Sequence, residues 1–232
     1  LAPGTIRRIV GFARPYRLAI GAFLLLIVLD AAAGAATPLV YREIIDTGTT
    51  LITLGGDHSI ALPLLRAHAK KYGPVSLVHI DAHIDTWESE FEEVKYSHGT
   101  PFRYALQEGL IRAGEYMQIG IRGPLSGEND YADAEKLGAR TVTIHEVMEK
   151  GIPEILKEVH QRMKGPVYLT VDIDSADPAF APGTGTPEVG GLTSYQLLQL
   201  ARGLHGLNLI GFDLVEVSPP YDHGDITAIL AS

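Results

Sequence analysis

The chain contains six residues of the types that bind divalent metal ions, grouped in three short clusters. The segments LGGDHS, DAHID and DID supply them: His58, Asp81, His83, Asp85, Asp172 and Asp174. Carboxylates and imidazoles suit Mn²⁺, Mg²⁺ and Zn²⁺. The four ionised aspartates would balance the charge of two divalent cations. The sequence therefore predicts a two-metal centre, which lowers the pKa of a bound water and favours hydrolysis at neutral pH.

The spacing within the clusters supports this prediction. Asp81, His83 and Asp85 alternate along the chain, as do Asp172 and Asp174, and alternate residues of an extended backbone point to the same side. A lone DxHxD string is moderately informative, since surface loops also contain such strings, but its combination with DxD and GGDH is much more specific. In the alternative without metal, mutual repulsion would require these carboxylates to be dispersed over the surface.

The composition narrows the class of protein. The chain has 232 residues, enough for one large domain or two small ones, and a formal net charge of −9. Nucleic acid is an unsuitable partner, because its phosphates require a basic face. An acidic protein suits a small cationic ligand. The absence of cysteine excludes disulfides and thiolate metal sites, so that metal binding must rely on oxygen and imidazole donors.

The pattern from residue 51 onward predicts an α/β fold. Short β-branched runs predict strands at 51–54, 75–80, 117–121, 141–144, 167–173 and 209–217, and amphipathic stretches predict helices at 60–71, 101–108, 131–137, 153–163 and 194–204. Strands that alternate with helices indicate a mostly parallel sheet. Polar clusters follow Leu54, Ile80, Val171 and Val215. They would meet at the carboxyl edge of the sheet, where open parallel sheets bind ligands.

The N-terminal region differs in composition from the remainder. Residues 18–40 contain a single charge, Asp30, and four arginines precede them. This pattern predicts a membrane-spanning helix with a cytoplasmic N-terminus, and the alternative is a buried, alanine-rich core helix. Residues 1–48 also resemble the first transmembrane segment of an ABC exporter, through "RPYR" and "PLVYREIID". No Walker A motif follows, so we expect a tether, a fusion or an assembly artefact (domain 1–50) rather than a transporter.

Five segments of the remaining chain resemble the ureohydrolase family, the group of arginases and agmatinases. They are LGGDHS, DAHIDT, SHGTPF, DIDSADPAFAPGTGTPEVGG and EVSPPYD, and their details are most similar to agmatinases. The resemblance covers about residues 51–232 and implies a three-layer arginase-like α/β fold with two Mn²⁺ per chain. Compared with the family pattern, we expect this catalytic domain to be truncated at both ends and preceded by the apolar helix. A trimer or hexamer is the expected assembly.

The resemblance also implies how the metals are held. His58 and Asp85 would bind one Mn²⁺, and His83 and Asp174 would bind the other. Asp81 and Asp172 would bridge the two ions.

Two further residues take catalytic roles by the same resemblance. His98 would shuttle a proton to the departing amine, and Glu216 would pair with the guanidinium group of the substrate. Asp85 would also hold the hydroxide by a hydrogen bond. Hydroxide would attack the guanidinium carbon, and urea and an amine would leave.

The expected reaction is hydrolysis of agmatine to urea and putrescine in the cytoplasm, with the N-terminal segment as a membrane tether. Other guanidino compounds stay open as substrates: guanidinobutyrate, guanidinopropionate and arginine. A second alternative is a mononuclear zinc deacetylase on a related fold, which would leave His58 and Asp85 without a role. A third is a non-catalytic truncated fusion with a vestigial metal site.

Several conspicuous residues have simpler interpretations. We expect Asp57 to shape the turn after Gly55-Gly56, Asp177 to fix a loop, and His79 to be a satisfied core histidine. Trp87 would wall the pocket or pack against the core. His223 lies close in sequence to Glu216, but a role at the site is the lesser alternative.

Overall fold

The computed structural model describes residue 5, residues 12–90 and residues 94–232. The chain divides into two compact units, Leu1–Glu43 and Ile44–Ser232. The boundary predicted from the sequence lies between residues 50 and 51, a few residues further along the chain.

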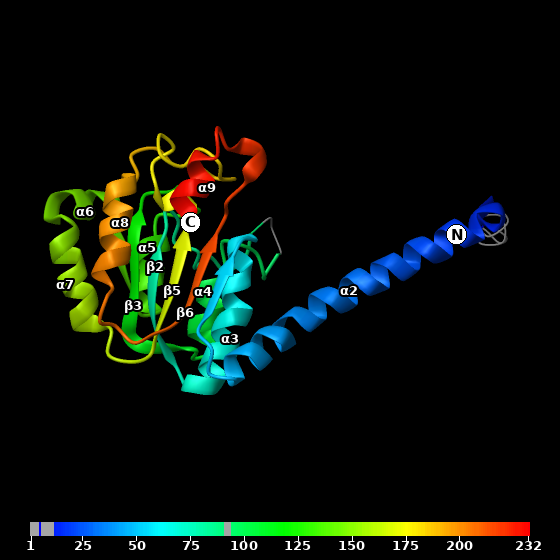
Figure 1. The fold of residues 1–232 in the computed structure, drawn as a ribbon, viewed down its shortest axis with the longest axis horizontal. Helices are drawn as coiled ribbons and strands as arrows, with labels where there is room; N and C mark the ends of the chain where they lie inside the picture. The colour runs from blue at the N-terminus through cyan, green and yellow to red at the C-terminus, as the bar shows by residue number, and fades with distance from the viewer. Residues whose placement is uncertain (1–4, 6–11, 91–93) are drawn as a thin grey trace. The chain divides into compact units, whose positions relative to one another are not determined.

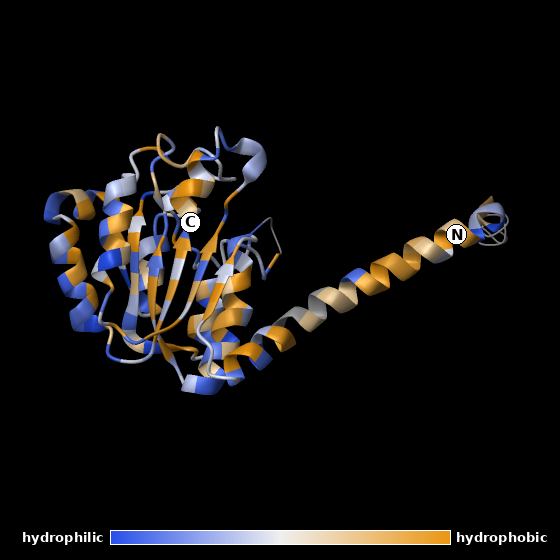
Figure 2. Cartoon of the chain, viewed as in Figure 1, coloured by the Kyte–Doolittle hydropathy of each residue, from blue (hydrophilic) through white to orange (hydrophobic). Residues whose placement is uncertain are grey.

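The first unit is dominated by one long helix. A short 3₁₀ helix, η1 (Arg14–Tyr16), leads into α2 (Arg17–Asp46), which continues into the start of the second unit. Figure 2 shows that α2 is coloured hydrophobic over much of its length. An 18-residue window within residues 14–33 has a mean hydropathy of 1.9, and none of that window is buried. Its length and composition would suit a membrane span, but a single helix near the N-terminus is weak evidence, so the tether stays a prediction.

The second unit is built on a parallel sheet. Within the described residues the strand order is β1-β6-β5-β2-β3-β4, and every neighbouring pair is parallel. The strands are β1 (Leu51–Leu54), β2 (Val75–Ile80), β3 (Ile111–Ile121), β4 (Ala139–Thr143), β5 (Val167–Asp172) and β6 (Leu209–Val215). Every residue of β2 and β5 is buried, as expected for central strands covered on both faces. The predicted parallel α/β fold is confirmed.

Helices cover both faces of this sheet and make a three-layer structure (Figure 1). One side carries α3 (Ala61–Tyr72) and α4 (Pro101–Gln107), and the other carries α6 (Ile144–Lys150), α7 (Ile152–Arg162) and α8 (Ser194–Gly203). Helix α5 (Asp130–Lys136) packs on β4, and α9 (Ile226–Ala231) ends the chain. The main apolar core lies between the sheet and α6, α7 and α8, and includes Val78, Ile80, Met117 and Ile155.

Several elements differ from the sequence prediction. Strand β3 begins at Ile111, earlier than the expected residue 117, and β6 ends at Val215 rather than 217. Helices α6 and α9 were not predicted. The predicted strand at 141–144 includes one residue too many, because Ile144 begins helix α6. Thr143 caps that helix by accepting a hydrogen bond from the Glu146 N–H at 3.3 Å.

Candidate metal centre

The turn after β1 brings His58 into the interior of the second unit. Gly55 and Gly56 take positive φ angles of 94° and 79°, which glycine adopts without steric cost. The Asp57 carboxylate then accepts a hydrogen bond from the Ser59 N–H at 3.0 Å and caps the 3₁₀ helix η2 (His58–Ile60). The predicted turn role of Asp57 is confirmed. His58 itself is buried, with 1% of its surface exposed.

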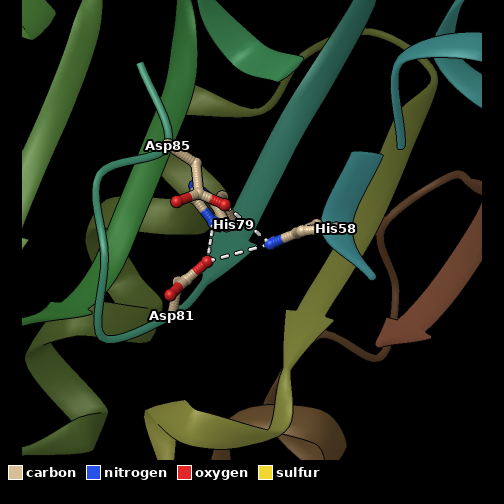
Figure 3. A group of neighbouring side chains, drawn as sticks. All are labelled: His58, His79, Asp81 and Asp85. Carbon is tan, nitrogen blue, oxygen red and sulfur yellow. Dashed lines mark hydrogen bonds and ion pairs between the residues drawn. The ribbon is translucent and has the colours of Figure 1, made fainter. Parts of the chain in front are cut away.

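Three aspartates surround the Nδ1 atom of His58. Its distance is 2.9 Å to Asp85 Oδ2, 3.1 Å to Asp81 Oδ2 and 3.4 Å to Asp172 Oδ2. Figure 3 shows His58 approaching Asp81 and Asp85, which lie after the end of β2. Residues from three segments distant in sequence, after β1, after β2 and at the end of β5, therefore meet at one point.

A second group lies beside the first. His83 Nδ1 is 3.0 Å from Asp174 Oδ2 and 3.6 Å from Asp81 Oδ1. Thr186 and the Ala82 N–H donate hydrogen bonds to Asp174 at 3.1 Å and 3.2 Å. Gly123 makes room for the imidazole, because a Cβ at this position would lie 2.3 Å from His83 Cδ2. Asp81 belongs to both groups, as expected of a bridging ligand.

The donor atoms of the two groups suit metal ions, and the surroundings of His58 Nδ1 illustrate this most clearly. His58 Nδ1 is buried and has no hydrogen-bond partner among the described residues, although carboxylate oxygens surround it. A buried nitrogen left in this state is costly unless it has another use. Oxygen and imidazole donors from the described residues converge in two overlapping groups, and this arrangement fits two divalent cations of the Mn²⁺ class.

Burial and mutual repulsion perturb the carboxylates strongly. Burial, reinforced by the charge of Asp81, raises the pKa of Asp85 to about 7. Burial and the charges of Asp174 and Asp81 raise the pKa of Asp172. Burial opposes a charged His83, but hydrogen bonds and attraction from Asp174 and Asp81 raise its pKa to about 12. Without cations, the cluster therefore retains protons that metal binding would have to displace.

Two site residues have a backbone conformation that is unusual for their type. Asp85 has a φ of 46° and Glu216 a φ of 65°. A non-glycine residue in the left-handed region costs about 1 kcal/mol or more, and such residues cluster at functional sites. Glu216 follows β6, and its Oε1 accepts a hydrogen bond from the His58 N–H at 2.8 Å. The conformation of Glu216 is thus tied to the turn that carries His58.

A cavity of about 310 Å³ opens above the two groups. His98 and Glu216 line it, and so does Trp87, which confirms the pocket-wall interpretation of that residue. The His98 side chain is 40% exposed, and its Nε2 lies 3.7 Å from Glu90 Oε2. Glu90 and Glu188 also line the cavity and were not predicted. None of the described residues that line it is a lysine or arginine, so the pocket is acidic.

Arg122 holds the backbone segments that carry Asp174 and Glu188, and this role was also not predicted. Its guanidinium donates to the backbone carbonyls of Asp174 at 2.7 Å and Glu188 at 2.6 Å, among others. Asp177 fixes the neighbouring loop by accepting from the N–H groups of Ala179 and Gly190, which confirms its predicted role. The exposed His223 is not among the residues that line the cavity.

We expect the metal-free protein to lose stability as the pH rises above about 6.5. In an unfolded chain the pKa of histidine is about 6.5 and that of aspartate is about 4. In the folded protein the pKa values of His58, His83 and Asp85 are all raised above these values. Above pH 6.5 the folded state therefore binds more protons than the unfolded state, and the free energy of unfolding falls with pH. Differential scanning fluorimetry with a chelator should show Tm falling by about 5 °C between pH 6.5 and 8.5.

The same scan with saturating Mn²⁺ is the control, since the rest of the molecule is unchanged. Bound cations replace the retained protons, so the Mn²⁺-loaded protein should not show this loss. A metal-free Tm that rises over this range would contradict the prediction.

The comparisons with known proteins agree with one another. The model of the arginase family matches residues 33–232. The chain is 49% identical over 193 residues to "Agmatinase, mitochondrial" of Gallus gallus and 48% identical to "Guanidino acid hydrolase, mitochondrial" of Homo sapiens. Each match covers 83% of this chain but only 56% and 54% of those proteins. A Burkholderia thailandensis structure described as a hypothetical agmatinase superposes with a TM-score of 0.77 at 47% identity, covering 85% of this chain and 60% of its own.

These comparisons support the predicted arginase-like fold and the ureohydrolase resemblance. The family match begins at residue 33, within α2, whereas the sequence analysis began the resemblance at about residue 51. The resemblance of residues 1–48 to an exporter segment receives no support from them.

Proposed function

The chain belongs to the arginase family, and on that basis we propose that it is a binuclear manganese amidinohydrolase which releases urea from a guanidino compound. The observation that supports this most directly is the pair of donor groups that share Asp81 beside an acidic cavity. The chain spans little more than half the length of the curated relatives compared above, so the activity of the whole protein is part of the proposal.

We assign the six clustered residues as ligands of two Mn²⁺ ions. One ion would be held by His58 and Asp85 and the other by His83 and Asp174, with Asp81 and Asp172 shared. When bound, the two ions would supply a water of lowered pKa and positive charge to stabilise the transition state. A mononuclear zinc deacetylase would leave His58 and Asp85 unused, yet both are buried in the cluster.

Glu216 would bind the guanidinium group. Its carboxylate lines the cavity and is held by the His58 N–H, so it lies beside the metal-binding turn. Burial raises the pKa of Glu216, and a cation bound beside it would favour the ionised form. Charge-assisted hydrogen bonds from a planar guanidinium to this carboxylate would fix the orientation of the reacting carbon.

His98 would deliver a proton to the departing amine. Its imidazole is partly exposed at the cavity and lies near Glu90, so it can exchange protons with solvent and face the substrate. An imidazole side chain is chemically suited to proton transfer at neutral pH.

The charge of the cavity favours agmatine among the guanidino compounds. Glu90 and Glu188 add negative charge, and the described lining residues include no lysine or arginine that could pair with a substrate carboxylate. Agmatine has an amine at its far end, whereas guanidinobutyrate and guanidinopropionate have a carboxylate. Hydrolysis of agmatine would yield urea and putrescine. Relatives with both kinds of name are equally similar to the chain, so the substrate must be measured.

A urea-release assay with added Mn²⁺ tests the proposal on agmatine, guanidinobutyrate, guanidinopropionate and arginine. We expect kcat/KM for agmatine to be at least about tenfold higher than for either guanidino acid, since each 1.4 kcal/mol of discrimination is tenfold. Release of urea from a guanidino acid alone would overturn the substrate assignment. A folded protein that binds Mn²⁺ but releases no urea would support the non-catalytic alternative. Assembly into a trimer or hexamer and a membrane tether through residues 18–40 stay predictions.

A further inference from the structure

A row of buried polar side chains crosses the sheet directly beneath the metal-ligand cluster. The strand register pairs Asp213 of β6 with Thr170 of β5, Thr170 with His79 of β2, His79 with Gln118 of β3, and Gln118 with Thr141 of β4. All five side chains are buried. We call this set the polar row: Asp213, Thr170, His79, Gln118 and Thr141. The interior of a parallel sheet is otherwise apolar, and buried polar groups are costly unless they are paired.

The polar row lies one step below the ligands on the same face of the sheet. Asp81 follows His79 by two residues, and Asp172 follows Thr170 by two. Alternate residues of a strand point to the same side. The row is therefore placed to hydrogen-bond the ligands from behind, and it does so at two points.

The first point is His58, reached through Thr170. The Thr170 hydroxyl donates its hydrogen to Asp213 Oδ1 at 2.5 Å, and the Tyr168 hydroxyl donates to Asp213 Oδ2 at 2.6 Å. Because a hydroxyl has one hydrogen, the Thr170 oxygen can only accept from His58 Nε2, which lies 2.8 Å away. His58 Nε2 must then carry the hydrogen. In a neutral imidazole this leaves the lone pair on Nδ1, the atom that faces the aspartates.

The second point is Asp81, reached through His79. Thr141 donates to Gln118 Oε1 at 2.7 Å, so the Gln118 amide N–H₂ faces the Tyr116 hydroxyl, to which it donates at 3.0 Å. The Tyr116 hydroxyl lies 3.1 Å from His79 Nδ1, and His79 Nε2 lies 2.6 Å from Asp81 Oδ2. With Tyr116 donating to Nδ1, His79 donates from Nε2 to the Asp81 carboxylate; Figure 3 marks this contact by a dashed line.

His79 therefore has no nitrogen left for a metal ion. Its position alone would group it with His58, Asp81 and Asp85 as a metal ligand. Both of its ring nitrogens are used, one by Tyr116 and the other by Asp81. By contrast, one ring nitrogen of His58 is used by Thr170, and the other has no hydrogen-bond partner in the part of the chain that the structure describes. The two buried histidines thus differ in their hydrogen-bond partners rather than in their burial.

We propose that the polar row fixes the hydrogen positions of both histidines, so that His58 binds metal through Nδ1 and His79 supports Asp81 without binding metal. Thr170, Asp213 and His79 are then positioning residues. This inference rests on the proposed two-metal function, and it adds to that function a reason why one buried histidine is a ligand and its neighbour is not. Residues that orient metal ligands in this way commonly change metal affinity by about 10- to 100-fold.

Thr170 offers a matched pair of variants for the first point. Thr170→Val removes the hydroxyl at nearly constant volume, and Thr170→Ser keeps it. Isothermal calorimetry of chelator-treated protein with Mn²⁺ measures the affinity for each ion. We expect Thr170→Val to lower the affinity for one of the two ions by about 10- to 100-fold. The Mn²⁺ affinity of Thr170→Ser should stay within about threefold of wild type. The serine hydroxyl can still donate to Asp213 and accept from His58 Nε2. Equal affinity of the folded valine variant and wild type would overturn the inference.

His79 offers a test by stoichiometry. His79→Leu removes the donor to Asp81, whereas Gln can present an amide N–H near the position of Nε2. We expect His79→Leu to bind two Mn²⁺ more weakly, and His79→Gln to recover much of the affinity. A leucine variant that binds a single ion would show that His79 is itself a ligand, against the inference.

Two controls keep these outcomes separate from folding and from the proposed function. Wild type is titrated first, and a wild-type chain that binds fewer than two Mn²⁺ contradicts the proposed function rather than the role of the polar row. Circular dichroism and Tm of each metal-free variant establish that it is folded. If Thr170→Val does not fold, Asp213→Leu tests the same hydrogen bonds, because it removes both acceptor oxygens and frees the Thr170 hydroxyl to donate to His58. Unchanged Mn²⁺ affinity in that variant would overturn the inference equally.

Discussion

Replacing Asp174 by alanine is expected to lower urea release by at least about 10³-fold, as for the loss of a residue that acts within a catalytic unit, and to reduce bound Mn²⁺ from two ions to one. Asp174 Oδ2 lies 3.0 Å from His83 Nδ1, and its loss leaves the His83 side with the shared Asp81 and Asp172. One remaining ion would give less activation of the water and less charge stabilisation than a two-metal centre. Urea release and metal content by mass spectrometry measure the two effects.

The same variant distinguishes lost metal from lost structure. Burial and the charge of Asp81 raise the pKa of Asp174, so this carboxyl is an unfavourable group in the metal-free fold. Alanine should leave the metal-free Tm unchanged or higher, while the Tm gain on adding Mn²⁺ shrinks. Asp133→Ala, which removes an exposed carboxylate paired with Lys136, is the matched control and should keep wild-type activity. Equal activity of Asp174→Ala and wild type would sink the assigned mechanism.

Replacing Glu216 by glutamine should reduce kcat/KM by about 10²- to 10³-fold, which corresponds to the loss of one half-buried charged partner. Glutamine has nearly the same shape, and its oxygen can still accept the hydrogen bond that Glu216 Oε1 receives from the His58 N–H. It lacks the negative charge that would pair with the guanidinium group. We expect the larger part of the loss in KM, measured in the urea-release assay with agmatine, and two Mn²⁺ ions should still bind.

Glu188 provides the comparison for this variant. It lines the same cavity, and its side chain is 29% exposed, so solvent and salt screen part of its charge. Glu188→Gln should change kcat/KM by no more than about tenfold, in keeping with a partly exposed charge. If the two variants lose activity equally, the net charge of the cavity matters and the placement of Glu216 does not.

The location of the centre could be predicted from the sequence because it depends on local signals. Strands β1 and β2 have the predicted bounds, Leu51–Leu54 and Val75–Ile80, since each is a short apolar run beside a turn that glycine marks. Parallel strands bring their carboxyl ends to one edge, so the polar residues after them had to meet there. The close approach of His58 to Asp81 and Asp172 follows from those two facts.

The support of the centre could not be predicted, because it depends on contacts between distant segments. His79 was interpreted as a satisfied core histidine, which is correct as far as burial goes. Its partner Tyr116 lies 37 residues away, and only the register of β2 against β3 brings the two together. Arg122 contacts backbone carbonyls more than 50 residues away, and a carbonyl is present at every position. No residue type in the sequence marks such a partner.

The error at β4 has a different origin. The pattern at 141–144 satisfied a strand prediction, but Thr143 and Glu146 are spaced as in a helix N-cap. That capping signal is present in the sequence, and it sets the end of the strand and the start of helix α6 at Ile144 despite the β-branched residues that precede it.

The polar row also bears on how the sheet assembles. A parallel sheet of apolar strands encodes its alignment weakly, since one buried valine substitutes readily for another. Here each of five neighbouring strands places a single polar residue at one level. A strand that paired one residue out of step would turn its polar side chain to the opposite face, and a slip of two would leave buried donors and acceptors facing apolar neighbours. The residues that orient the ligands thereby raise the free energy of sheets whose strands are paired out of register. The register that satisfies the polar row is also the register that brings the ligands together.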